Sequence, residues 1–142
     1  MVDLLKIIDF YQSFDIYKNY TYAEIFNHIY PSLKNQQFKA YHDEKGIYAF
    51  ANWALFDDIN EKYFLETYIV PSDGWDSGST LYFIDLVASR KAKQVILDQQ
   101  RFMTKKFGLN RKVKWIRFHE DKRILKEFET KKHYLNNWEI NG

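Results

Sequence analysis

A four-residue turn, Asp43-Glu44-Lys45-Gly46, most constrains what this chain can fold into. Runs of strand-forming residues lie on both sides of it, at 37–42 and 46–55. An acidic start and a glycine at the end suit a hairpin turn, so the two runs predict a pair of antiparallel strands. Further strands are predicted at 67–70, 80–88 and 111–118.

Apolar residues at helical spacing predict helices on either side of these strands. The predicted helices lie at 2–11, 22–30, 57–64, 91–107 and 122–135. Thr21 is a suitable N-cap for the second helix, and Pro31 should end it. Asp57 or Asp58 can cap the third, and Gly108 should end the fourth. Because neither a repeat nor a linker interrupts residues 1–142, we expect one α+β domain with a mostly antiparallel sheet flanked by helices.

The composition excludes several classes of site. The chain contains no cysteine, which rules out disulfides, thiolate catalysis and Cys-ligated zinc. A phosphate-binding glycine loop, a GxSxG elbow and an HExxH motif are also missing, so we predict no metal site. Four histidines are scattered along the chain, and His28 is interpreted as a polar-face or hydrogen-bonded residue of the second helix. No apolar run approaches the roughly 20 residues of a membrane span, and we expect a cytoplasmic protein.

Charge is distributed unevenly along the sequence. Residues 1–89 carry a net charge of −7 and residues 90–142 a net charge of +9. Solvated helix faces explain such an excess of lysine, and so does a site for an acidic partner, either nucleic acid or a small acidic carrier protein. Alternation within 111–118 places its charges on one side of a strand, which makes nucleic acid the less favoured partner. Lys105, Lys106 and Arg111 follow the long helix and are predicted to bind the acidic partner.

A carboxylate lies within the predicted strand at 80–88. Asp is depleted in strands, and a buried ionised carboxylate is costly unless it is paired, so Asp85 either faces solvent, accepts hydrogen bonds from a neighbouring loop or belongs to a site. Trp75, in the preceding turn GWDSG, packs over either the core edge or a ligand. Trp53 is most simply interpreted as a core residue of a central strand.

Several short blocks, in this order, resemble the toxin-activating acyltransferases that modify RTX toxins, the hemolysin-activating lysine-acyltransferases. The resemblance covers about residues 13–118. Its blocks are IYKNYTYAEIFNHIYPSLKNQQF at 16–38, NWA at 52–54, WDSG at 75–78, YFIDLVAS at 82–89 and TKKF at 104–107.

The resemblance implies a GNAT-like fold and the transfer of a fatty acyl group from acyl carrier protein to a lysine of a protoxin. Asp85 corresponds to one of the two catalytic residues of the family, and the catalytic histidine falls on Tyr17. Tyrosine is a poor general base at neutral pH but a good hydrogen-bond donor. We expect Asp85 and Tyr17 within about 15 Å of each other, close enough for one substrate group to meet both.

Conserved blocks of the family also suggest which residues meet the substrate. Trp75 should border the cleft at Asp85 and Tyr17. The same interpretation makes the matching block residues candidate substrate contacts, namely Trp53, Trp75, Ser77 and Gly78.

The resulting hypothesis is a cytosolic transferase that modifies a secreted toxin or bacteriocin precursor before export. Its donor would be acyl carrier protein or another activated conjugate, with no bound cofactor. Residues 88–91 read Ala-Ser-Arg-Lys where the family has Ala-Pro-Phe-Gly, which suggests a divergent member, including the relatives encoded with microcins. Because Tyr17 replaces the histidine, a non-catalytic scaffold for a second maturation protein is the alternative, and a basic nucleic-acid-binding module is a further one.

Overall fold

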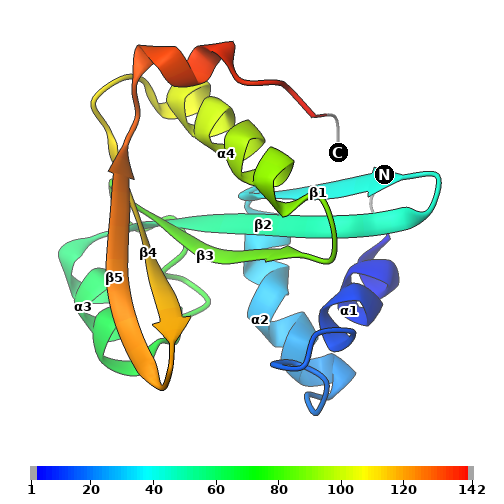
Figure 1. The fold of residues 1–142 in the computed structure, drawn as a ribbon. Coiled ribbons are helices and arrows are strands. Elements are labelled where there is room, and N and C mark those ends of the chain that lie inside the picture. The colour runs from blue at the N-terminus through cyan, green and yellow to red at the C-terminus, as the bar shows by residue number, and fades with distance from the viewer. Residues whose placement is uncertain (1–2, 141–142) are drawn as a thin grey trace.

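Five strands form one sheet in a computed structural model that describes residues 3–140 (Figure 1). The strands, in their order across the sheet, are β1 (Phe38–Asp43), β2 (Gly46–Phe56), β3 (Thr80–Ala88), β4 (Lys112–His119) and β5 (Lys122–Glu129). The helices are α1 (Leu4–Gln12), α2 (Tyr22–Lys34), α3 (Asp58–Thr67), α4 (Ala92–Phe107) and a short 3-10 helix, η1 (Lys132–Asn136). All neighbouring strands are antiparallel except β3 and β4, which are parallel.

Helices cover both faces of the sheet. Figure 1 shows α4 on one face and α1, α2 and α3 on the other. On the α4 face, Trp53 and Phe83 pack with Met103, whereas on the other face Phe50 packs with α1 and α2. The predicted α+β architecture with a mostly antiparallel sheet is therefore confirmed, and it is consistent with a GNAT-like fold.

Local sequence signals explain most element boundaries. The β1–β2 hairpin closes at the Asp43↔Gly46 pair, and Gly46 has the positive φ of 106° that glycine tolerates best. Thr21 and Glu24 form a reciprocal capping box at the start of α2. Asp57 caps α3 by accepting a hydrogen bond from the backbone N–H of Asn60. These predictions, and the end of α4 at its predicted position, are confirmed.

The helix predicted at 122–135 is wrong. Residues 122–129 form β5, which pairs with β4 through a two-residue turn at Glu120 and Asp121. Both turn residues have positive φ, 47° and 59°, as a tight hairpin with the right strand twist requires. Pairing with β4 therefore overrides the helix-forming residues of this segment, and only η1 remains helical.

Two further predictions need correction. The strand expected at 67–70 does not form, because α3 continues to Thr67 and ends at Tyr68 in the left-handed conformation. The second helix does not end at Pro31 but continues to Lys34. Proline removes one helical hydrogen bond, but Ser32, the residue directly after it, is fully buried, so packing sustains the last turn of α2.

The parallel strands β3 and β4 stay together over only two residue pairs. These are Leu81↔Val113 and Tyr82↔Lys114, after which the strands diverge. Glu61 of α3 braces the point of divergence by accepting a hydrogen bond from Tyr82 at 2.6 Å and contacting Lys114 Nζ at 3.4 Å. From residue 83 onward, the edge of β3 that faces β4 has no paired strand within residues 3–140.

A β-bulge in β3 turns the strand at Ile84. Asn52 pairs with Asp85 and Trp53 with Phe83, so Ile84 is an extra residue opposite β2. Phe83 faces α4, and regular alternation would turn Asp85 the same way. The bulge instead directs Asp85 toward α1 and α2, where its hydrogen-bond partners lie.

Candidate functional site

The buried carboxylate of Asp85 is the centre of the candidate site. It accepts hydrogen bonds from Tyr11 Oη at 2.8 Å and from Tyr17 Oη at 3.1 Å. His28 Nε2 lies 2.7 Å from Asp85 Oδ2. Only 7% of the Asp85 side chain is exposed, compared with 33% for His28, so the histidine, like half-buried Tyr17, reaches solvent.

Three segments bring these side chains to β3. Tyr11 lies in the last turn of α1 with a fully buried side chain, and Tyr17 lies in the connection between α1 and α2. His28 projects from the middle of α2, a helix held against the sheet by buried Ile25 and Ile29. The Tyr11 and Tyr17 rings contact each other at a centroid distance of 5.1 Å. Packing of the two helices and of the connection between them thus positions the hydrogen-bond donors of the group.

The electrostatics of the group favour an ionised Asp85. Burial alone would raise its pKa, but the charge of His28 and hydrogen bonds from His28, Tyr11 and Tyr17 together hold the pKa below its ordinary value. Attraction to the Asp85 carboxylate raises the His28 pKa, although burial opposes this. Burial, followed by the Asp85 charge, raises the pKa of both tyrosines. The tyrosines are therefore neutral donors at physiological pH.

Ionised Asp85 fixes the tautomer of neutral His28. A carboxylate only accepts hydrogen bonds, so Nε2 must carry the proton that it donates to Asp85. The lone pair of a neutral His28 then lies on Nδ1, which has no hydrogen-bond partner among residues 3–140. This arrangement, a carboxylate that orients a histidine with a free lone pair, can accept a proton from a substrate.

The structure brings together two of the residues singled out in the sequence. Asp85 and Tyr17 lie within hydrogen-bonding distance, well inside the expected 15 Å. Tyr17 cannot act as a base here, because its raised pKa makes the phenolate less accessible than in free tyrosine. Its hydroxyl instead donates to the carboxylate, which is the donor role that tyrosine was expected to fill.

Trp75 and Trp53 lie in the core, away from this group. Trp75 is 1% exposed and packs with Phe56, Phe64 and Tyr82 beneath α3. Trp53 is also 1% exposed and faces α4, on the opposite side of the sheet from Asp85. Trp75 therefore packs over the core, the first of its two interpretations, and the expected contact of both tryptophans with substrate stays a prediction.

The turn that contains Ser77 and Gly78 holds two elements together. The backbone N–H groups of both residues donate to Leu55 O, at 2.8 and 3.0 Å. Ser77 Oγ also accepts a hydrogen bond from the N–H of Asp57, the N-cap of α3. Both residues thus join the end of β2 to the start of α3, and their expected substrate contact stays a prediction.

Sequence reasoning did not assign His28 to the site. It predicted a polar-face or hydrogen-bonded histidine, and the hydrogen bond is present, but the partner is Asp85, 57 residues later. One signal was available: His28 follows Ile25 by three residues and precedes Ile29, which places it at the edge of the buried face of α2. A histidine at such a boundary can reach a buried partner while remaining accessible.

A cavity of about 300 Å³ occupies the space where β3 and β4 diverge. Ile84 and Leu86, which flank Asp85 in the sequence, form part of its wall, together with residues of α4 and β4. Its lining is mainly apolar, and includes Phe83, Ile96, Trp115, Ile116 and Phe128. The cavity and the Asp85 group thus meet at the same segment of β3.

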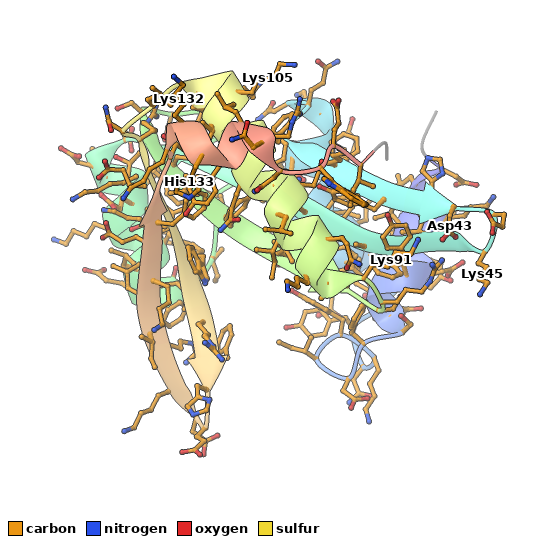
Figure 2. All side chains as sticks on the ribbon, turned by 45° about the horizontal axis from the view of Figure 1, so that its top comes forward. Asp43, Lys45, Lys91, Lys105, Lys132 and His133 are labelled. Atoms are coloured by element: carbon orange, nitrogen blue, oxygen red, sulfur yellow. The ribbon has the colours of Figure 1, made fainter. Side chains whose placement is uncertain are left out.

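The predicted partner-binding residues gather at the end of α4. Lys105 and Lys106 are exposed, and Figure 2 shows Lys105 on the same side of the molecule as Lys132 of η1. Lys106 Nζ lies 5.9 Å and the Arg111 guanidinium 5.5 Å from the centroid of the Phe107 ring. We call Lys105, Lys106 and Arg111 the α4 basic patch, and its partner stays a prediction.

Residues 3–140 contain neither a cluster of three metal-ligating side chains nor a helix that is long and apolar enough to cross a membrane.

A model of the RTX toxin acyltransferase family matches residues 4–129. The chain belongs to this family. The match includes α1, α2 and β3, and therefore all four side chains of the Asp85 group. Membership confirms the resemblance found in the sequence and implies an acyltransferase that activates RTX toxins. No curated protein matches the chain significantly.

Proposed function

We propose that this protein transfers an acyl group from an acyl carrier protein, or another activated donor, to a lysine of a secreted toxin or bacteriocin precursor in the cytosol. The observation that carries the proposal is the 2.7 Å pairing of accessible His28 with buried Asp85. Membership of the acyltransferase family supports the reaction class. A histidine that supplies the base also removes the main reason for a non-catalytic scaffold.

In the proposed reaction, the lysine amine attacks the carbonyl carbon of the donor thioester. An N–C bond forms as the C–S bond breaks, and the thiolate leaves as the other product. His28 Nδ1 accepts the proton that the amine loses, and the imidazolium then returns it to the thiolate. The Asp85 carboxylate holds the ring and stabilises its positive charge, while the two tyrosines hold the carboxylate.

The cavity between β3 and β4 is the proposed place of the acyl donor. Its apolar lining suits a hydrocarbon or another extended, weakly polar chain. The unpaired edge of β3 offers backbone N–H and C=O groups to amides of such a chain. A donor bound there would lie beside Ile84 and Leu86, the neighbours of Asp85.

The test is transfer by purified protein, with product mass followed over time. The assay uses an acyl-loaded carrier protein as donor and, in parallel, an RTX toxin precursor and a microcin precursor as acceptors. His28→Gln should slow transfer by about 10²–10⁴-fold, the usual contribution of a general base. Asp85→Asn, which keeps the shape but removes the charge, should slow it by about 10²-fold.

His42→Gln is the matched control, because His42 is an exposed histidine of β1 outside the Asp85 group. It should transfer at the wild-type rate. Urea midpoints of all three variants verify that each is folded. Wild-type rates in both His28→Gln and Asp85→Asn would refute the enzymatic role and favour a scaffold in a maturation complex.

A further inference from the structure

A second connection joins α2 to Asp85, in addition to His28. Ser32 is one helical turn after His28 and fully buried, as is Asn52 of β2. Asn52 Nδ2 donates to Ser32 Oγ at 3.2 Å, and Asn52 Oδ1 accepts a hydrogen bond from the backbone N–H of Asp85 at 2.8 Å. Both the side chain and the backbone of Asp85 are therefore connected to α2.

Hydrogen-bond logic fixes the orientation of this connection. The backbone N–H of Asp85 can only donate, so the amide oxygen of Asn52 must face it and the amide nitrogen must face Ser32. Ser32 Oγ donates its own proton to Ile29 O at 2.7 Å, which leaves its lone pairs for Asn52. Each polar atom is thus fixed as either a donor or an acceptor, and the hydrogen bonds run from α2 through β2 to β3.

The connection meets β3 at the bulge. Asn52 pairs with Asp85 where the register skips Ile84, so its side chain holds the backbone of the residue that the bulge redirects. A shift of this backbone would move the carboxylate away from Nε2 of His28. Errors of about 1 Å in catalytic geometry cost on the order of 100-fold in rate.

We infer that Ser32 and Asn52 are positioning residues that set the distance between His28 and Asp85. Only the effect of this inference on the rate of acyl transfer rests on the proposed function. Neither residue is exposed, so neither meets the substrate. Their effect passes through the spacing of α2 and β3, and loss of either should change the proton affinity of His28 as well as the rate.

The decisive measurement is the His28 pKa of the ligand-free protein, obtained by NMR titration. Asn52→Leu keeps the approximate shape but removes both hydrogen bonds, and Ser32→Ala is the milder variant in case Asn52→Leu does not fold. In both we expect the His28 pKa to fall toward its ordinary value, because the carboxylate moves away. We expect kcat for acyl transfer to fall by about 10–100-fold with little change in KM.

Thr130→Val is the matched control. Thr130 is also fully buried, and its hydroxyl bridges Gly108 O and the N–H of Arg111, away from the Asp85 group. It should lose stability without changing the His28 pKa or kcat. If Ser32→Ala behaves like Thr130→Val, the positioning role is refuted. If the wild-type protein transfers no acyl group, the proposed function fails, but the NMR titration still decides the positioning role.

Discussion

Replacement of Gly78 by alanine tests what the WDSG turn does. Gly78 does not have a positive φ, so its backbone conformation suits any residue. A Cβ atom there would lie 2.5 Å from the backbone nitrogen and 2.6 Å from the Cα of Asp57, distances that real Cβ atoms do not show. It would also overlap the carbonyl oxygen of Phe56. The neighbours are backbone atoms, so they cannot rotate away.

The expected cost follows from these contacts. Overpacking of a rigid site costs about 1–3 kcal/mol. Moving the turn away also weakens the hydrogen bonds from Ser77 and Gly78 to Leu55 O, at about 1 kcal/mol each. We expect Gly78→Ala to destabilise the protein by about 3 kcal/mol, a large part of the 5–15 kcal/mol of a typical domain. The melting temperature should fall by about 10 °C.

Gly74→Ala is the control in the same turn. There the nearest atom to a Cβ would be Asn60 Oδ1 at 2.7 Å, the end of a side chain that can rotate. Its cost should stay below about 1.5 kcal/mol, the value of the one hydrogen bond that the Asn60 side chain gives to Asp57. Urea unfolding of both variants measures the difference. A Gly78→Ala protein with wild-type stability but no transfer activity would refute the packing argument and favour substrate contact.

Three further outcomes are expected. Tyr11→Phe and Tyr17→Phe should each destabilise the protein by about 1–3 kcal/mol, with the larger loss at buried Tyr11, as urea unfolding would measure. In the transfer assay, both should slow the reaction less than His28→Gln does. A Tyr17→Phe rate as low as that of His28→Gln would instead assign a chemical role to the Tyr17 hydroxyl. Because the His28 pKa is raised in the folded protein, its stabilisation is complete below about pH 6.5 and is lost as the pH rises through the folded pKa. The Asp85 pKa is lowered, so its stabilisation is present above about pH 3.9 and is lost as the pH falls through the folded pKa. His28→Gln should therefore flatten the alkaline side of a plot of stability against pH. Charge reversal of the α4 basic patch to glutamate should weaken capture of an acyl carrier protein at low salt and leave the urea midpoint unchanged, and unchanged capture in a pull-down would exclude the patch as its site.

Local signals made much of the fold predictable. The strand at 80–88 and the capping role of Thr21 depend on residues close in sequence, and the structure has both where the sequence placed them. The segment at 122–129 was mispredicted because its structure depends on β4 rather than on its own residues. Propensity gives way to pairing when a tight turn brings a partner strand alongside.

The candidate site was harder to predict, because it is assembled across distant segments. Asp85 was found through its unusual position in a strand and through the family resemblance. No local pattern shows that Ile84 is an extra residue in β3, and the bulge decides which helices Asp85 meets. The contact of His28 with Asp85 depends on how α2 packs on the sheet, which the periodicity of α2 alone does not specify.

The short association of β3 with β4 has a consequence for local stability. Within residues 3–140, backbone pairing joins β4 to β3 at two ladder pairs only, and side-chain contacts such as the Glu61 bridge and the stacking of Phe83 on Phe128 supply the rest, while most of β5 is exposed. Figure 1 shows this hairpin running away from the rest of the sheet. Its outer amide protons should therefore exchange with solvent through local opening, well before those of β2 and β3. Any molecule that fills the cavity between β3 and β4 would tie the hairpin to the sheet, and slower exchange in the outer part of β4 would report that binding without any turnover.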